Sequence, residues 1–461
     1  MQSNRKKAKI DMLHGSIWNK LIYYALPVAA TGILEQLFNA SDIAIVGNFA
    51  GSAKTIAVAA VGANSPIIGL ILNLFIGIAL GTNVVIANAI GREDEKTIHK
   101  AVHTSIIMAI VGGLIVMIIG ELLIGHLLKM LNVPDDVFPY ALLYIRIYLI
   151  GMPVILLYNF EAAIFRSVGE TKIPLQVLAI SGVLNVGLNL FFVLVLKMTV
   201  NGVATATVIA NVVSSLLLFI KLIRTKQVIQ IKKEEITFDR ELFIKIMEIG
   251  LPAGIQTAVF AVANIVIQSA INSLGTIVMA ASSAALNIEI CVYDILNSFS
   301  QACTTFVGQN YGAGNLKRCR KILGLCIIED AIATALMILF VILLGKTLLS
   351  LFNNDPRVIN IGYTRLLIIF TAYTFSMLYE NMSGYLRGFG ISLLPAILTT
   401  IGVCGVRIIW ISFVFPLRKT FSTIILAYPL SLSITAVLIF LALMKYRPSK
   451  MQQQRTMTYN S

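Results

Sequence analysis

The sequence predicts an all-α integral membrane protein, in which twelve transmembrane helices form two six-helix lobes. Apolar residues make up 57% of the 461 residues and charged residues 13%, against about 45–50% and about 25% in ordinary soluble domains. The apolar residues gather in runs long enough to cross a hydrocarbon core of about 30 Å. Short motifs recur in the same order in both halves of the chain. Because each half has an even number of spans, we expect the halves to be related by an axis along the membrane normal.

The apolar runs place the spans and the domain boundaries. We expect spans at residues 21–46, 56–86, 100–121, 137–160, 173–196, 201–223, 245–271, 280–307, 321–344, 358–383, 393–415 and 421–444. Several exceed the minimum length, which indicates tilted or kinked helices. The predicted domains are an N-lobe (1–223), a cytoplasmic linker (224–244), a C-lobe (245–445) and a cytoplasmic tail (446–461) that looks disordered.

Two pairs of motifs carry the internal repeat. Ala25-Leu26-Pro27 opens the first half and Gly250-Leu251-Pro252 the second. The motif at residues 164–169 recurs at residues 385–390, an offset of 221. A parallel pseudo-twofold of this kind, around a central cavity, is typical of transporters. Within the second span, Gly77 and Gly81 have the spacing at which two helix backbones approach closely, so we expect packing there.

The basic residues predict the orientation. With a cytoplasmic N-terminus, 26 of the 36 Lys and Arg residues fall on the cytoplasmic side. This bias predicts that both termini are cytoplasmic. The net charge of +14 is then explained by loops that face the cytoplasm and anionic lipid. We therefore expect the lipid bilayer as a partner and no nucleic acid.

The sequence offers no pattern typical of an enzyme or a bound metal. The five cysteines show no CxxC spacing, so disulfides and zinc are not expected. His99 and His103 stand four residues apart on a helix start, but no third ligand accompanies them. No nucleophile lies beside a base in a way that suggests hydrolysis. We expect a protein that is not an enzyme and carries no cofactor.

Polar stripes within the spans mark the candidate site. In the first span, Glu35, Asn39 and Asp42 are spaced i, i+4, i+7, which places them on one face of a helix. A carboxylate inside a membrane is costly unless it is solvated or paired, so this stripe should face a water-filled cavity. The fifth span carries an uncharged stripe of Ser181, Asn185 and Asn189. Asparagine can instead join helices to one another.

The second half distributes its polar groups differently. Its stripes comprise Asn264, Gln268 and Asn272; Asn287, Asp294, Asn297 and Gln301; and Tyr373, Ser376, Glu380 and Ser383. Asp294 and Glu380 either line the cavity or neutralise buried arginines. Glu289 can pair with an intramembrane arginine such as Arg146, Arg365 or Arg407. Glu329 and Asp330 open the ninth span, where acids near a helix N-terminus are favourable.

Several motifs together resemble those of the multidrug and toxic compound extrusion (MATE) family, over residues 15–445. In the first half they are Ala25-Leu26-Pro27, Asn39-Ala40-Ser41-Asp42, Val46-Gly47, residues 166–174, and Asn185 with Asn189. In the second half they are Gly250-Leu251-Pro252, residues 309–314 (Gln-Asn-Tyr-Gly-Ala-Gly) and residues 386–390 (Leu-Arg-Gly-Phe-Gly). Each piece is short, but their order and spacing make the resemblance specific.

The resemblance implies a cation-coupled antiporter that expels organic cations by alternating access, in the cell membrane. The coupling-ion aspartate of the family maps onto Asp42, and its fifth-span Asn pair maps onto Asn185 and Asn189. Many proton-coupled members carry Asp where this chain has Asn189. Sodium-type members carry a seventh-span acid where this chain has Asn264 and Gln268. The coupling cation, H⁺ or Na⁺, therefore stays open.

The alternatives are a lipid-linked oligosaccharide flippase of the same superfamily, a major-facilitator transporter and a membrane enzyme. A flippase should have a more cationic cavity, and the basic major-facilitator signature is missing between spans two and three. We expect a monomer that exports small organic cations. The candidate coupling-ion residues are Asp42, Glu35, Asn185 and Asn189. The candidate substrate-cavity residues are Asn39, Tyr158, Asn159, Asn264, Gln268, Asp294, Tyr379 and Glu380, with cation–π contacts from the tyrosines.

Overall fold

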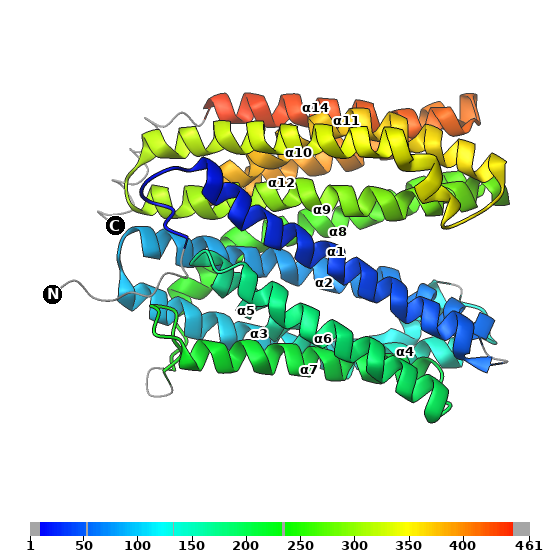
Figure 1. Cartoon of the computed structure of the whole chain (residues 1–461), viewed down its shortest axis with the longest axis horizontal. Coiled ribbons are helices and arrows are strands. Elements are labelled where there is room, and N and C mark those ends of the chain that lie inside the picture. The colour runs from blue at the N-terminus through cyan, green and yellow to red at the C-terminus, as the bar shows by residue number, and fades with distance from the viewer. Residues whose placement is uncertain (1–9, 52–53, 132, 233–235, 446–461) are drawn as a thin grey trace. The chain divides into compact units, whose positions relative to one another are not determined.

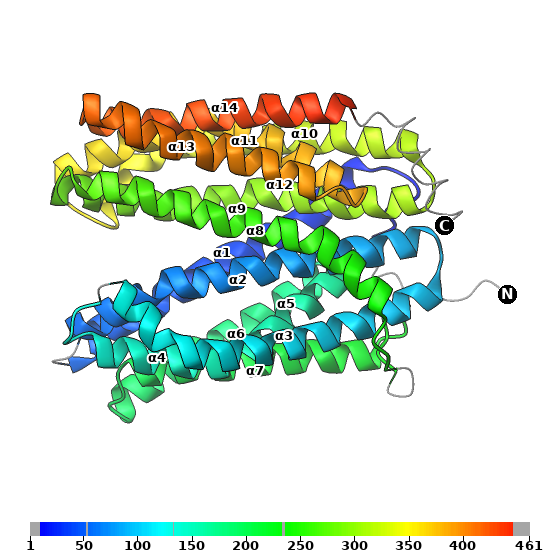
Figure 2. The ribbon, with the colours of Figure 1, turned by 180° about the vertical axis from the view of Figure 1, so that it is seen from behind.

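The computed structural model describes residues 10–51, 54–131, 133–232 and 236–445, and every regular element in them is a helix (Figures 1 and 2). The predicted tail and parts of the predicted linker lie outside the described residues. The helices of the first half are α1 (Trp18–Phe49), α2 (Lys54–Gly91), α3 (Glu95–Met130), α4 (Phe138–Ile150), α5 (Met152–Ser167), α6 (Lys172–Leu190) with a π-helical end (Phe191–Val195), and α7 (Val200–Arg224). Those of the second half are α8 (Arg240–Asn272), α9 (Thr276–Gly312), α10 (Leu316–Ser350), α11 (Pro356–Gly388), α12 (Leu393–Thr399), α13 (Val406–Ile409) and α14 (Phe421–Lys445).

The number of spans agrees with the predicted fold class. Among the described residues, eleven helices are long and apolar enough to cross a membrane, one of them being the continuous helical run Leu393–Leu417 that contains α12 and α13. The twelfth span is the pair α4 and α5, which is bent by 51° at Gly151. Pro153 lies in the first turn of α5 and has no N–H to donate back to α4, which explains the break. A kink near Pro153 agrees with the kinked helices expected from the sequence, but the fourth predicted span, 137–160, ended two turns too early, because α5 continues to Ser167.

The chain divides into two compact units. Unit 1 contains residues 30–90 and 94–250, and unit 2 contains residues 11–29, 91–93 and 251–445 of the described chain. The division falls within α1 after Ala29 and within α8 after Gly250, close to the two Leu-Pro motifs. The lobe boundaries at residues 223 and 245 stay a prediction.

The turns repeat along with the motifs. Three pairs of residues with a positive φ recur at nearly the same offset: Gly51 and Gly275, Glu93 and Gly314, and Gly169 and Gly390. The last two pairs are 221 residues apart. A positive φ strains any residue with a Cβ and is most easily adopted by glycine. Glu93 is therefore the position where the first half keeps the turn of the repeat without the glycine.

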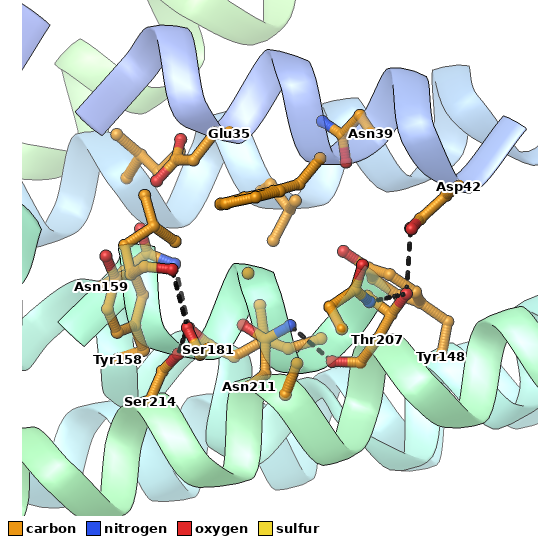
Figure 3. Close-up of a pocket in the computed structure, with 18 residues that line it drawn as sticks. Glu35, Asn39, Asp42, Tyr148, Tyr158, Asn159, Ser181, Thr207, Asn211 and Ser214 are labelled. Carbon is orange, nitrogen blue, oxygen red and sulfur yellow. Dashed lines mark hydrogen bonds between the residues drawn. The ribbon is translucent and has the colours of Figure 1, made fainter. Parts of the chain in front are cut away.

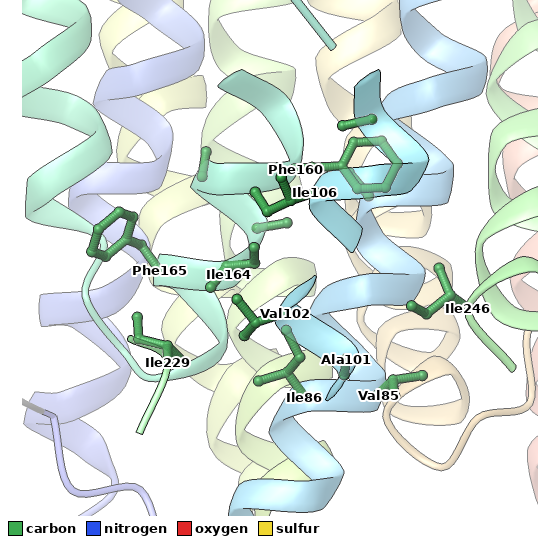
Figure 4. Packing of buried hydrophobic residues seen from close by; sticks show 14 of the residues in the cluster. Val85, Ile86, Ala101, Val102, Ile106, Phe160, Ile164, Phe165, Ile229 and Ile246 are labelled. Atoms are coloured by element: carbon green, nitrogen blue, oxygen red, sulfur yellow. The ribbon is translucent and has the colours of Figure 1, made fainter. Parts of the chain in front are cut away.

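Each unit has its own apolar core. In unit 1, α3 packs against α4 and α5, and α7 packs against α4, α5 and α6; Figure 4 shows part of this core, including Ile86, Val102 and Phe160. In unit 2, α11 packs against α9, α10 and α14, and these helices run side by side in Figures 1 and 2.

The predicted close packing at Gly81 is confirmed. A Cβ added to Gly81 would lie 2.9 Å from the backbone nitrogen of Gly250. Conversely, a Cβ on Gly250 would lie 2.9 Å from the carbonyl oxygen of Gly77. The start of α8 therefore lies directly on the glycines of α2. Asp239 fixes this start: it accepts hydrogen bonds from two backbone N–H groups of α8 and from Lys100 of α3, and the Lys100 ammonium lowers the pKa of Asp239.

Candidate functional site: a polar cavity in unit 1

The predicted stripe on α1 lines a cavity of about 150 Å³ inside unit 1 (Figure 3). The rest of the lining comes mainly from α5, α6 and α7, with smaller contributions from α2 and α4. Six of the predicted site residues line this cavity: Glu35, Asn39, Asp42, Tyr158, Asn159 and Asn185. Predicted residues from three helices therefore lie around one cavity. Their roles in binding stay a prediction.

Asp42 is buried at one end of the cavity, with 6% of its surface exposed. Asn189 Nδ2 donates to Asp42 Oδ1 at 2.5 Å, and Thr207 Oγ1 donates to Asp42 Oδ2 at 3.1 Å. Asn189 Nδ2 also donates to Asn185 Oδ1, so the predicted Asn pair reaches the aspartate through Asn189. Both donors are neutral, and no basic side chain of the described residues forms an ion pair with Asp42. The carboxylate therefore keeps its capacity to bind a cation.

Asn189, which does not itself line the cavity, carries a further acceptor next to Asp42. Its side chain is fully buried, and its Oδ1 has no hydrogen-bond partner among the described residues. Buried acceptors are nearly always satisfied. An unsatisfied amide oxygen on the residue that contacts Asp42 is therefore consistent with a ligand that donates a hydrogen bond or carries a positive charge.

The sixth span contributes residues that the sequence analysis missed. Thr207, Asn211 and Ser214 line the cavity from α7. Their spacing is i, i+4, i+7, the same as that of the stripe on α1, so the signal was present. Ser214 donates to Ser181 of α6 at 2.5 Å, which joins the uncharged wall to the predicted stripe of the fifth span.

Glu161 is a buried acid that the sequence analysis also missed. It is fully buried on α5, one turn beyond the cavity residue Tyr158. Ser215 Oγ donates to its Oε2 at 3.1 Å, and its Oε1 has no hydrogen-bond partner among the described residues. The predicted span ended at residue 160 and so left Glu161 outside the membrane. Because α5 continues to Ser167, the carboxyl group lies inside the helix bundle, beside the cavity wall.

The predicted residues of the second half lie in unit 2 and do not contribute to this cavity. Glu380 is buried, accepts from Tyr293 Oη at 2.9 Å and lies 3.9 Å from Arg387. Tyr379 is buried beside it. Asp294 Oδ2 has no hydrogen-bond partner among the described residues. Gln268 donates to Asn272, and Asn264 accepts from Arg407. Their assignment to a substrate cavity stays a prediction.

The interpretation of Glu329 and Asp330 was wrong. These acids do not lie at a helix N-terminus, because α10 begins at Leu316, more than three turns earlier. Asp330 is fully buried and accepts from Asn381 Nδ2 at 2.5 Å and from Thr334 Oγ1 at 3.3 Å. Unit 2 therefore has its own carboxylate held by an asparagine and a threonine, like Asp42 in unit 1. The alternative for Glu289 is confirmed: it pairs with Arg365.

Outside the spans, the turn after α5 explains one motif of the resemblance. Gly169 has φ +85°, a conformation that a side chain would oppose. Glu170 follows it and is buried, and Gln227 Nε2 donates to its Oε1 at 3.3 Å. Burial raises the pKa of Glu170 above its usual range. This motif thus fixes the end of α5 against the segment that follows α7.

Comparison with known proteins agrees with this architecture. A solved structure described as MATE in the bent conformation superposes with a TM-score of 0.88 at 20% identity, covering 98% of this chain and 99% of that one. The probable multidrug resistance protein YoeA of Bacillus subtilis is 25% identical over 400 residues, 85% of this chain and 86% of YoeA. A FAD transporter of Shewanella oneidensis is 22% identical over 372 residues, 80% of this chain and 81% of its own length.

The family assignment rests on both halves. The MatE family model matches residues 27–191 and then again residues 252–411. Each match begins at the proline of a Leu-Pro motif, Pro27 in the first half and Pro252 in the second. The same unit is therefore found twice, as the repeat predicts. These two matches cover most of the chain, and the protein belongs to the MatE family of membrane transporters.

Proposed function

We propose that this protein is a multidrug efflux antiporter, which exports organic cations in exchange for inward H⁺ or Na⁺. The observation that carries the proposal is the carboxylate of Asp42, buried among neutral donors at the end of a polar cavity. A carboxylate in a membrane span marks an ion or substrate pathway by default. The names of relatives such as YoeA support multidrug transport.

The mechanism follows from competition for negative charge. Glu35 and Asp42 belong to the same cavity, so an organic cation and the coupling cation both gain from these carboxylates. If binding of one weakens binding of the other, the effect is reciprocal. The inward cation then releases the drug on the outside, and the drug releases the cation on the inside. Glu161, beside the cavity wall, is a further acid that can take up a proton in this cycle.

Alternating access is assigned to the predicted lobes, residues 1–223 and 245–445, in a monomer. In transporters built from repeats, one repeat rocks against the other around a site near the membrane midplane. The bent and proline-containing helices support this assignment: Pro27 lies inside α1 and Pro252 inside α8.

Replacing Glu35 by Gln tests whether cavity charge selects the substrate. Two unit charges 4 Å apart interact by about 1–4 kcal/mol in surroundings between water and a protein surface, so we expect binding of a cationic dye to weaken by about fivefold or more. A neutral dye of the same shape should bind equally to both proteins. Glu121→Gln is the matched control, because Glu121 pairs with Arg146 and does not line the cavity. Equal losses for both dyes would indicate damage to the cavity instead.

Ethidium efflux from cells with an imposed proton or sodium gradient tests the coupling. Efflux driven by one gradient identifies the ion. An absence of efflux under either gradient would contradict the proposal and favour the alternative function, a lipid-linked oligosaccharide flippase.

Both termini are expected to face the cytoplasm, which cysteine labelling can test. Lys54 and Lys317 are exposed at the starts of α2 and α10. In a variant without the five native cysteines, an impermeant thiol reagent added to intact cells should modify Lys54→Cys and spare Lys317→Cys. The reverse pattern would invert the orientation of the protein.

A further inference from the structure

Arg407 lies in an unusual stretch of helix within unit 2. It belongs to α13, a four-residue α-helical segment between two π-helical segments, Thr400–Gly405 and Trp410–Val414. The π-helix is rare and is found frequently at functional sites. Only 6% of the Arg407 surface is exposed, so its guanidinium is held inside the helix bundle at the middle of a membrane span.

All contacts of the Arg407 guanidinium are with neutral groups. Nε donates to Ser431 Oγ at 3.1 Å, and Nη1 donates to Asn264 Oδ1 at 3.4 Å. The guanidinium carbon lies 4.2 Å from the ring centroid of Tyr428. A guanidinium has five N–H donors, and these two hydrogen bonds leave the others available. No carboxylate of the described residues lies within ion-pair distance of Arg407.

Three other arginines within the helices, Arg365, Arg387 and Arg146, have carboxylate partners. Arg365 binds Glu289 through two hydrogen bonds of 2.6 and 2.9 Å. Arg387 lies 3.9 Å from Glu380, and Arg146 lies 3.3 Å from Glu121. Arg365 also contacts Tyr428, so two arginines share one tyrosine, and only Arg365 pairs with a glutamate. This cluster has a net charge of +1 contributed by Arg407.

An uncompensated buried charge is strongly unfavourable. The cluster therefore gains most from an anion that approaches the free N–H groups of Arg407. A planar or tetrahedral oxyanion suits a guanidinium, because it can accept two parallel hydrogen bonds. Ser431 and Asn264 hold two of the guanidinium nitrogens, which orients the remaining donors before the anion arrives.

We propose that Arg407, supported by Asn264, Ser431 and Tyr428, is an oxyanion-binding subsite that receives the carboxylate or phosphate group of a transported molecule. The proposal rests on the proposed export function and specifies its substrates. It adds zwitterions and anions to the organic cations favoured by the acids of unit 1. Asn264, predicted as a substrate-cavity residue, acquires a defined role: it positions the guanidinium.

A matched pair of rhodamine dyes tests the subsite on the purified full-length protein. One dye carries a free carboxylate, and the other is its ethyl ester, a cation of nearly the same shape. Arg407→Gln should weaken binding of the free-acid dye by about tenfold or more, because a charge-assisted contact is lost. Binding of the ester should change by less than about twofold. Arg146→Gln, which removes an arginine that is paired with Glu121, is the control and should affect neither dye.

Asn264→Asp provides the second variant, in case Arg407→Gln does not fold. It is nearly isosteric and places a carboxylate where Oδ1 of Asn264 now accepts from Arg407. This internal anion should raise the thermal unfolding midpoint. It should also weaken binding of the free-acid dye as strongly as Arg407→Gln does. Unchanged binding of the free-acid dye to both variants would overturn the proposal.

Inorganic phosphate separates the possible sources of the oxyanion. If phosphate displaces the free-acid dye from wild-type protein, the subsite also accepts free oxyanions; if it does not, the oxyanion must be part of a larger molecule. Failure of wild-type protein to bind either dye would count against the export function and not against the subsite. Phosphate should then still raise the unfolding midpoint of wild-type protein but not of Arg407→Gln, and the absence of this difference would contradict the subsite.

Discussion

Replacing Asp42 by Asn should remove most ion-driven export while the protein still folds and reaches the membrane. Asp42 has no basic partner to lose, and its two hydrogen bonds come from the neutral groups of Asn189 and Thr207. An amide can preserve the contact with Thr207 but cannot bind a proton or Na⁺ as a carboxylate does. A coupling free energy of about 1–3 kcal/mol corresponds to a factor of about 5–150, and we expect a loss of gradient-driven efflux in this range.

Proteoliposomes with an imposed gradient provide the measurement. Thr207→Val removes one hydrogen bond but no charge, so it should reduce efflux only partly. Glu121→Gln, outside the cavity, should transport like the wild type. Wild-type efflux by Asp42→Asn, in protein that is shown to be folded, would transfer the coupling role to Glu35 or Glu161. Dye binding measured without a gradient separates ion coupling from substrate binding, because a variant that has lost only coupling still binds the dye.

The overall fold could be predicted because membrane insertion imposes strong constraints on sequence. Runs of apolar residues mark the spans, and the internal repeat shows which span of the first half corresponds to which span of the second. The stripe of Glu35, Asn39 and Asp42 located the cavity wall for the same reason: a carboxylate is too costly to face lipid. The same argument predicted an arginine partner for Glu289 among Arg146, Arg365 and Arg407, because a charge inside a membrane is costly without one, and the structure shows that the partner is Arg365.

Helix ends and weak polar residues could not be predicted as well. Glu161 was missed because an acid at the apparent end of a span needs no special explanation, and only the structure shows α5 continuing to Ser167. Asp330 was misplaced for the same reason. Thr207 was missed because a threonine can satisfy its own hydroxyl on the preceding turn, as it does here with the carbonyl of Val203. Such a residue gives little signal until a carboxylate from another helix is known to lie beside it.

Replacing Glu289 by Gln should cause the largest loss of stability in unit 2. Glu289 and Arg365 have side chains only 4% and 3% exposed, and both carboxylate oxygens accept from the guanidinium. Removing one partner of a buried pair costs about 3–5 kcal/mol, because the remaining charge is left uncompensated. Thermal unfolding of the purified protein measures the effect. Asp355→Asn is the matched control, since it breaks an exposed pair with Arg357 and such pairs contribute about 0–1 kcal/mol.

Arg407 makes this prediction more specific. With Glu289 neutral, Arg365 and Arg407 would both be unpaired around Tyr428, so the cluster would carry two buried positive charges. Adding Arg365→Met to Glu289→Gln removes one of these charges and should recover a large part of the lost stability. A double variant that is less stable than Glu289→Gln alone would show that the hydrogen bonds of Arg365 to Ser282 and Tyr428, and not its charge, hold this part of the bundle together.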